Sequence, residues 1–130
     1  FHGFMNNLKK IGLSALAGSL VATSAFAAER ESYYSDLVCS QEYKGTTKWL
    51  QSGLRPDCQT TFAIMEFDWA TQTKLYECIG QSLIYANEAN KLPVCVLLAR
   101  NDEELAFANS QDLTPFGIVL KVIDTRLWDQ

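Results

Sequence analysis

The sequence predicts an α/β (α+β) domain with a mixed central sheet and helices on its faces. Three observations point to this class. Helical and strand patterns alternate along the chain, which is typical of a sheet covered by helices. The run VCVLL, at 94–98, is apolar throughout, as in a strand buried on both faces. The 130 residues are 48% hydrophobic and 20% charged, which suits one ordinary globular domain.

The beginning of the chain predicts a secretory signal peptide over residues 5–27. Lys9 and Lys10 form a basic start, an apolar stretch follows, and Ala25-Phe26-Ala27 is a small-x-small cleavage motif. An N-terminal membrane anchor is the alternative, but the apolar stretch is short and rich in Gly, Ser and Ala. We therefore expect an exported bacterial protein, periplasmic or secreted. Its mature part, 28–130, is predicted to form a single domain without stable membrane insertion.

The charge and histidine content of the mature part exclude several functions. Nine Lys and Arg against fifteen Asp and Glu give it a formal charge of −6. Such a domain does not attract nucleic acid over its whole surface, so contact with nucleic acid requires a local basic patch. The single histidine, His2, precedes the mature part. Catalysis by histidine and histidine-ligated metals are therefore excluded, and any chemistry relies on carboxylates, Lys, Tyr or a hard metal ion.

All four cysteines lie in the mature part. An exported protein meets an oxidising compartment, and an even number of cysteines favours two disulfides. Of the three possible pairings, we favour Cys39–Cys58 and Cys78–Cys95, because each pair joins neighbouring predicted elements. A zinc site is the alternative, although no CxxC spacing occurs.

The first half of the mature part predicts one helix and a hairpin. Residues 30–43 show a rough apolar stripe typical of a helix, which Gly45 ends. Residues 46–51 form a candidate strand. A turn at 52–56 connects it to an extended run at 58–68, in one or two pieces.

The second half predicts alternating helices and strands. Residues 71–90 form the clearest helix, with a buried face made by Leu75, Cys78, Ile79, Ser82, Leu83 and Ala86. The strand at 94–98 follows. A short helix then runs from Asn101 or Asp102 to Ala108, and a last strand covers 117–123. The predicted order is α-β-β-β-α-β-α-β.

Acidic residues lie within the extended run. Strand alternation places Phe62, Ile64, Glu66 and Asp68 on one face and the residues between them on the other. Asp57 begins the preceding extended piece, and we expect a hairpin-like return to bring it next to Glu66. The run therefore predicts a cluster of carboxylates at one end of the sheet.

The helix that follows carries a polar stripe. Lys74, Gln81 and Tyr85 are spaced by seven and four residues, so they share one side of a helix, with Glu77 beside them. A polar stripe within an otherwise apolar helix needs a polar partner. The carboxylate cluster is the natural candidate.

These motifs resemble the PD-(D/E)XK nuclease-like superfamily. The resemblance is carried by Pro56-Asp57, Glu66-x-Asp68 and Gln81-x-x-x-Tyr85, and it spans about residues 33–98. The phrase AIMEFDW followed by ECIGQSLIYA is also similar to small uncharacterised bacterial proteins of this type. The resemblance implies an αβββαβ restriction-endonuclease-like core. It also implies that Asp57 and Glu66 bind a divalent metal, Mg²⁺ or Mn²⁺, while Gln81 and Tyr85 support the site or contact a phosphate.

The sequence departs from the superfamily at Asp68, where a lysine is expected. The superfamily contains relocated lysines, and Lys74 is the candidate here. Asp68 either strengthens metal binding as a third ligand or marks a site that has lost its activity. The acid that the superfamily carries on its first helix is Asp36 or Glu42.

Two main hypotheses follow from the resemblance. In the first, the carboxylates hold Mg²⁺, the metal polarises a phosphodiester and activates a water, and Lys74 stabilises the developing charge. In the second, the chain is a catalytically degenerate periplasmic or secreted binding module on the same fold. A glycosidase that pairs Glu66 with Asp57 or Asp68 is a third hypothesis, for which the mature part leaves little room.

Overall fold

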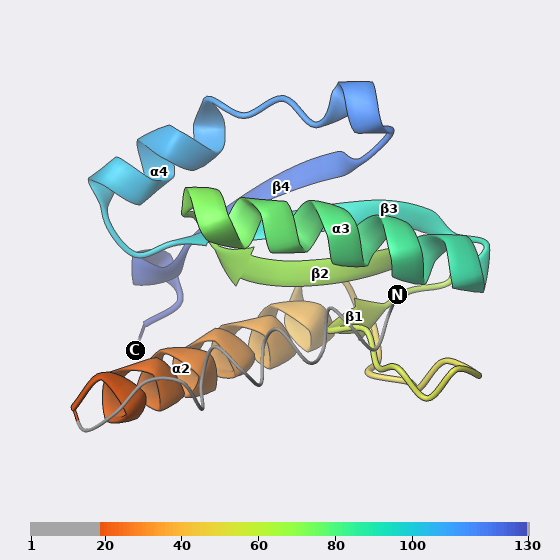
Figure 1. Cartoon of the computed structure of the whole chain (residues 1–130), viewed down its shortest axis with the longest axis horizontal. Helices are drawn as coiled ribbons and strands as arrows, with labels where there is room; N and C mark the ends of the chain where they lie inside the picture. The colour runs from red at the N-terminus through yellow and green to blue at the C-terminus, as the bar shows by residue number, and fades with distance from the viewer. Residues whose placement is uncertain (1–18, 130) are drawn as a thin grey trace.

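The computed structural model describes the backbone of residues 19–129 and side chains from residue 30 onward (Figure 1). The helices and strands in this range, in chain order, are α2 (Ser19–Gln41), β1 (Cys58–Gln59), β2 (Ala63–Trp69), α3 (Gln72–Ala89), β3 (Leu92–Ala99), α4 (Asp102–Asn109) and β4 (Val119–Asp124). Two short 3₁₀ helices, Thr114–Phe116 and Thr125–Leu127, flank β4.

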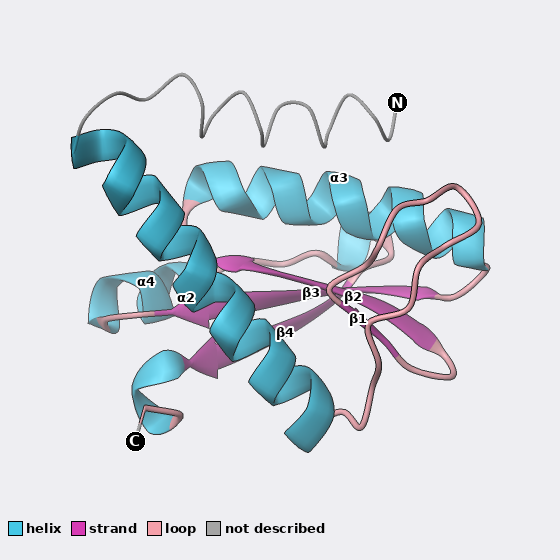
Figure 2. Cartoon of the chain, turned by 90° about the horizontal axis from the view of Figure 1, so that it is seen from below, coloured by secondary structure: helices cyan, strands magenta, loops and turns pink. Residues whose placement is uncertain are grey.

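The four strands form one mixed sheet with the order β1-β2-β3-β4. β1 is antiparallel to β2, whereas β2, β3 and β4 are mutually parallel. Helices α3 and α4 cover one face of this sheet (Figure 1), and α2 crosses the strands on the other face (Figure 2). The predicted α+β class with a mixed sheet and helices on both faces is therefore confirmed.

Strand β2 separates the two halves of the core. One set of its side chains packs with α2, in a cluster that includes Tyr34, Val38, Met65, Phe67 and Trp69. The alternate set faces α3, where Ile64 packs against Tyr85 and Ala86. The predicted alternation along this run is thus the one that the structure shows.

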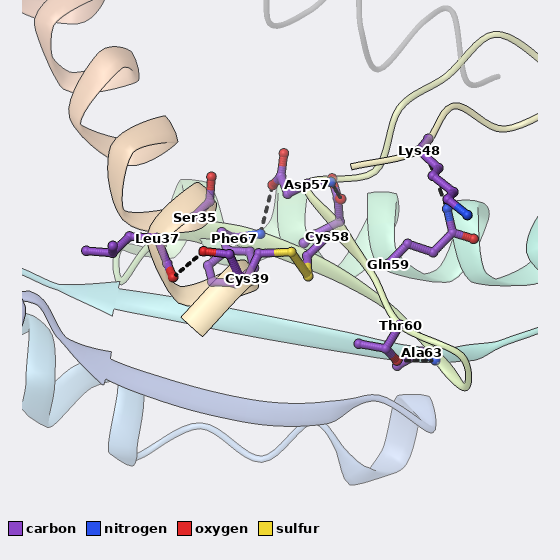
Figure 3. The surroundings of a disulfide bond; sticks show 12 residues. Ser35, Leu37, Cys39, Lys48, Asp57, Cys58, Gln59, Thr60, Ala63 and Phe67 are labelled. Carbon is purple, nitrogen blue, oxygen red and sulfur yellow. Dashed lines mark hydrogen bonds between the residues drawn. A yellow bond between two sulfur atoms is a disulfide. The ribbon is translucent and has the colours of Figure 1, made fainter. Parts of the chain in front are cut away.

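Two disulfide bonds tie the helices to the sheet. Cys39 of α2 is bonded to Cys58 of β1 (Figure 3), and Cys78 of α3 is bonded to Cys95 of β3. These are the two favoured pairs. All four cysteines are used, so the zinc alternative is wrong.

The predicted strand at 46–51 is wrong. Thr46 alone pairs, through an isolated antiparallel bridge to Gln59. The chain then turns back, with the Leu50 N–H donating to the Leu54 carbonyl at 2.7 Å and Gly53 at a φ of 89°. A longer strand cannot form here, because the partner strand, β1, contains only two residues.

Helix α2 is longer than the predicted helix at 30–43. It begins at Ser19, passes the predicted cleavage site after Ala27 without a break, and ends at Gln41. The rest of the predicted signal peptide, 5–18, lies outside the described residues. Within 19–129, none of the helices combines the length and the apolar character needed to cross a bilayer.

Gly45 packs directly against the Cys39–Cys58 bond, and Gly45→Ala is therefore expected to be destabilising. A Cβ at this position would overlap Cys58 Sγ and lie 3.0 Å from both Cys39 Sγ and the Gln59 carbonyl oxygen. Overpacking of this kind costs about 1–3 kcal/mol. The free energy of unfolding of the oxidised protein, from chemical denaturation, measures the loss. In a Cys39→Ala/Cys58→Ala background the sulfurs are absent, and the same substitution should cost clearly less. Equal costs in both backgrounds would contradict this explanation.

Candidate functional site

Asp57 and Glu66 lie opposite each other where β1 and β2 begin to pair. The register places Cys58 beside Met65, so the next opposed pair along the ladder is Asp57 and Glu66. The Asp57 N–H donates to Glu66 Oε2 at 2.8 Å, and the Phe67 N–H donates to Asp57 Oδ2 at 2.9 Å. The structure therefore brings together the two residues that were expected to be neighbours.

The two carboxylates act on the backbone of the opposite strand. The regular backbone pairing between β1 and β2 stops at Cys58. Beyond it, the side-chain carboxylates of Asp57 and Glu66 connect the two segments by accepting main-chain N–H groups. Figure 3 shows the bond between Asp57 and the Phe67 N–H. A buried N–H group left without an acceptor costs free energy, so each of these bonds favours the pairing of the two segments. At least one role of this acidic pair is thus to stabilise the junction of two strands.

The other polar residues of the predicted site are buried between β2 and α3. Glu66, Asp68, Gln81 and Tyr85 expose 2%, 0%, 1% and 3% of their surface. Glu66 and Asp68 share the face of β2 that carries Ile64, and this face packs against α3. The polar stripe of α3 and the acids of β2 therefore occupy the same interface, as expected. Because these side chains are buried, a substrate dissolved in water has no direct access to them.

Lys74 is on the same side of α3 as Gln81 and Tyr85, but its ammonium group lies near the helix surface. Lys74 Nζ forms an ion pair with Glu77 Oε2 at 3.3 Å, and the lysine side chain is 34% exposed. Glu77, which the sequence placed beside the stripe, is thus the partner of this lysine. The positive charge of Lys74 is therefore balanced by an acid of its own helix.

The described residues do not provide a ready three-carboxylate metal site. Between residues 19 and 129, no group of three or more His, Cys, Asp or Glu side chains could hold a metal ion. Magnesium prefers six oxygen ligands in a near-octahedral arrangement, usually one or two carboxylates with waters. Asp57, Glu66 and Asp68 do not meet this requirement as a set, and the Mg²⁺ or Mn²⁺ site stays a prediction.

A second candidate site lies on the long connection between α2 and β1. Residues 43–56, here called the basic loop, contain three cations and no acid. The cations are Lys44, Lys48 and Arg55, all exposed. Trp49 is 67% exposed, and the Arg55 guanidinium carbon lies 5.5 Å from the centre of its ring. An exposed aromatic ring beside cations is suited to stacking on a planar, negatively charged ligand.

A hollow of about 360 Å³ lies beside the basic loop. Its lining residues are Asp36, Cys39, Ser40, Gly45, Thr46, Thr47 and Arg55. A further cation, Lys91, is connected to the basic loop through Gln59: Lys91 Nζ donates to Gln59 Oε1 at 3.0 Å, and the Gln59 amide donates to the Lys48 carbonyl at 3.5 Å. Two acids also approach, Asp36 in the hollow and Glu88, which accepts the Ser52 N–H at 3.3 Å. The surface around the basic loop is therefore polar and carries charges of both signs.

The basic loop was missed at the sequence level because the cations were counted over the whole mature part. The signal that identifies it is local: no Asp or Glu occurs between Glu42 and Asp57. The net charge of an acidic protein does not reveal such a segment, because acids elsewhere in the chain outnumber its cations.

Comparison with protein-family models, with curated proteins and with solved structures finds no match to this chain. The resemblance to the PD-(D/E)XK superfamily therefore stays a prediction from the motifs. What the chain does has to be inferred from its own geometry.

If the acidic pair stabilises the strand junction, Asp57→Ala should lower the free energy of unfolding by about 1–3 kcal/mol, because the Phe67 N–H loses its acceptor. Asp57→Asn should cost less, since the amide keeps an oxygen at that position. Asp36→Ala removes an exposed acid from α2 and should change stability by less than about 0.5 kcal/mol. Chemical denaturation of the three variants tests the idea, and an Asp57→Ala variant as stable as Asp36→Ala would refute it.

Proposed function

We propose that this chain is an exported, non-catalytic binding module on a nuclease-like scaffold, and that it binds single-stranded nucleic acid through the basic loop. The observation that carries the proposal is the pairing of exposed Trp49 with Arg55 on a segment with three cations and no acid. The two disulfides are compatible with export.

Two interactions are expected to contribute to the affinity for single-stranded nucleic acid: stacking of bases on an aromatic ring and attraction of phosphates by cations. Single-stranded nucleic acids bind where aromatic side chains offer a stacking surface and cations follow the phosphate backbone. Trp49 provides the first, and Lys44, Lys48 and Arg55 provide the second. The rest of the mature domain is acidic and repels phosphates, so the ligand would be directed to this one surface.

The order of elements supports a nuclease-like scaffold. Antiparallel pairings at Thr46 and at β1 precede β2, which is parallel to β3 across helix α3. This order agrees with an αβββαβ core if the bridge at Thr46 is a shortened first strand. The restriction-endonuclease-like assignment is part of the proposal.

The predicted catalytic residues favour binding over catalysis. Glu66 and Asp68 are buried at the β2–α3 interface, and the carboxylates of Asp57 and Glu66 accept main-chain N–H groups. Lys74, the candidate replacement for the missing lysine, is ion-paired with Glu77. This arrangement serves the fold, and Asp68 then marks a degenerate site.

The proposal predicts that Trp49→Ala weakens binding of a fluorescently labelled oligothymidylate by about 1–3 kcal/mol, the worth of one stacked base. Lys48→Gln should weaken binding less and should reduce the slope of log affinity against log salt by about 0.7, the value for one phosphate contact on a single strand. Fluorescence anisotropy at several salt concentrations measures both effects.

Arg126→Gln is the matched control for charge, because it removes one exposed cation beyond β4, at the other edge of the sheet. It should leave the affinity for the oligonucleotide nearly unchanged. Equal affinities of the wild type, Trp49→Ala and Lys48→Gln would rule out the basic loop as the binding surface. No binding by the wild-type protein would reject the proposed ligand altogether.

Metal-dependent phosphodiester hydrolysis is the second candidate function. It is favoured by one observation, the 2.8 Å contact that sets Asp57 beside Glu66, the two residues the resemblance assigns to the metal. Asp57 is only half-buried and is the more accessible of the two.

A cleavage assay separates the two functions. Single- and double-stranded DNA and RNA are incubated with the oxidised protein and Mg²⁺ or Mn²⁺, beside EDTA and Asp57→Asn controls. As a binding module, the protein should leave every substrate intact. Cleavage that disappears both with EDTA and in the Asp57→Asn variant would establish the hydrolase instead, and Lys74→Gln would be the next variant to assay.

A further inference from the structure

Strand β4 forms an open edge of the sheet. It contains six residues, and in the described part of the chain its only strand partner is β3. Alternate backbone N–H and C=O groups along its outer side therefore point away from the sheet, ready to pair with another strand. The opposite edge differs, because β1 contains two residues and its outer side is bridged by Thr46.

Few of the usual devices protect the β4 edge. Proteins commonly block an edge with several charges, a proline, a bulge or a very short strand. β4 has one central charge, Lys121, and one terminal charge, Asp124, which is bonded to Arg126. Its remaining residues are the aliphatic Val119, Leu120, Val122 and Ile123, each partly exposed. This edge has the length and the composition of a strand that pairs.

The two ends of β4 carry different surface features. Beyond its C-terminal end, Leu127 is 78% exposed. At its N-terminal end there is a hollow of about 440 Å³. The lining residues of this hollow are Gln111, Asp112, Leu113, Thr114, Gly117, Ile118, Val119 and Leu120. One strand thus carries an exposed apolar side chain at one end and a partly apolar recess at the other.

We propose that two copies of this chain pair antiparallel through β4, which joins their sheets into one continuous sheet around a two-fold axis. The axis passes through Val122, which lies opposite Val122 of the other copy. Each Lys121 then lies opposite Ile123 of the other copy, and Leu120 lies opposite Asp124. Lysines of the two copies are not directly opposed, so the like-charge repulsion of a register centred on Lys121 is avoided.

The same register matches the recess with the exposed leucine. Continued beyond the strand ends, it sets Gly117 of one copy, which lines the hollow, opposite Leu127 of the other. Leu127 of one copy therefore reaches the hollow beside Ile118 and Val119 of its partner, and symmetry repeats the contact at the other end. A second copy is the preferred occupant because both halves of the contact lie on one strand, as a two-fold interface requires.

The first test measures association. Protein expressed from the whole sequence, with both disulfides formed, is examined by sedimentation velocity over a range of concentrations. A reversible dimer is expected. Leu127→Asp should weaken dimerisation by about tenfold or more, because it buries a charge in a partly apolar recess. Phe62→Asp is the matched control. Phe62 is 80% exposed and precedes β2, and this variant should dimerise like the wild type.

The second test measures the register. Lys121→Cys and Val122→Cys chains are prepared separately and oxidised alone or as a mixture, and covalent dimers are identified by mass. Val122→Cys alone should give the crosslinked dimer, because the two copies of this residue face each other across the axis. Lys121→Cys alone should give little, because the two Lys121 positions are offset along the strands, and the mixture should give little heterodimer, because side chains of adjacent positions point to opposite faces.

Three results would overturn the proposal: a wild-type protein that is monomeric at every concentration, a dimer unaffected by Leu127→Asp, or a crosslink that forms as readily with Lys121→Cys alone. None of them bears on binding by the basic loop, which lies at the other edge of the sheet. Failure of one proposal is therefore distinguishable from failure of the other.

Discussion

The two disulfide bonds are the constraint on which the arrangement of layers depends. One lies on each face of the sheet, so that α2 is fixed to β1 and α3 is fixed to β3. They close segments with sequence separations of 19 and 17 residues, and a crosslink over such a distance contributes about 3 kcal/mol. A small domain buries a modest fraction of its surface. Covalent links between its layers therefore matter more here than in a larger protein, and they hold β1 in place although it contributes only two residues to the sheet.

The sequence predicted the central elements because several independent patterns agree there. Residues 71–90 have an apolar face at helical spacing, and α3 covers Gln72–Ala89. The apolar run at 94–98 lies within β3, Leu92–Ala99, which is buried along most of its length. Alternation along β2 correctly divided Glu66 and Asp68 from Phe67. The cysteine pairing followed from the order of these elements, since each pair links a helix to the strand region that comes next.

What the sequence could not predict depends on contacts between distant segments. Residues 46–51 contain good strand formers, but strand propensity takes effect only where a partner strand is present, and Thr46 alone finds one. Alternation assigned Glu66 and Asp68 to a face without revealing that α3 covers this face completely. The same limit applies to Lys74, whose place on the helix stripe was foreseen, whereas its ion pair with Glu77 depends on side-chain conformation. Motif order alone therefore suggests catalysis, and burial is what argues against it.

The two proposals concern opposite edges of one sheet, and this placement links them. The basic loop is bridged to β1, the first strand in the spatial order, and β4 is the last. A dimer joined through β4 would therefore carry its two basic loops at the far ends of a sheet twice as wide, about 35–40 Å apart at a strand spacing of about 4.8 Å. Two weak sites at a fixed separation bind one long strand more tightly than either does alone, because the second contact becomes intramolecular. The basic loop of each copy would then function as half of a bivalent surface for a long strand. An oligonucleotide too short to span both loops would bind each loop separately, whether or not the chain dimerises.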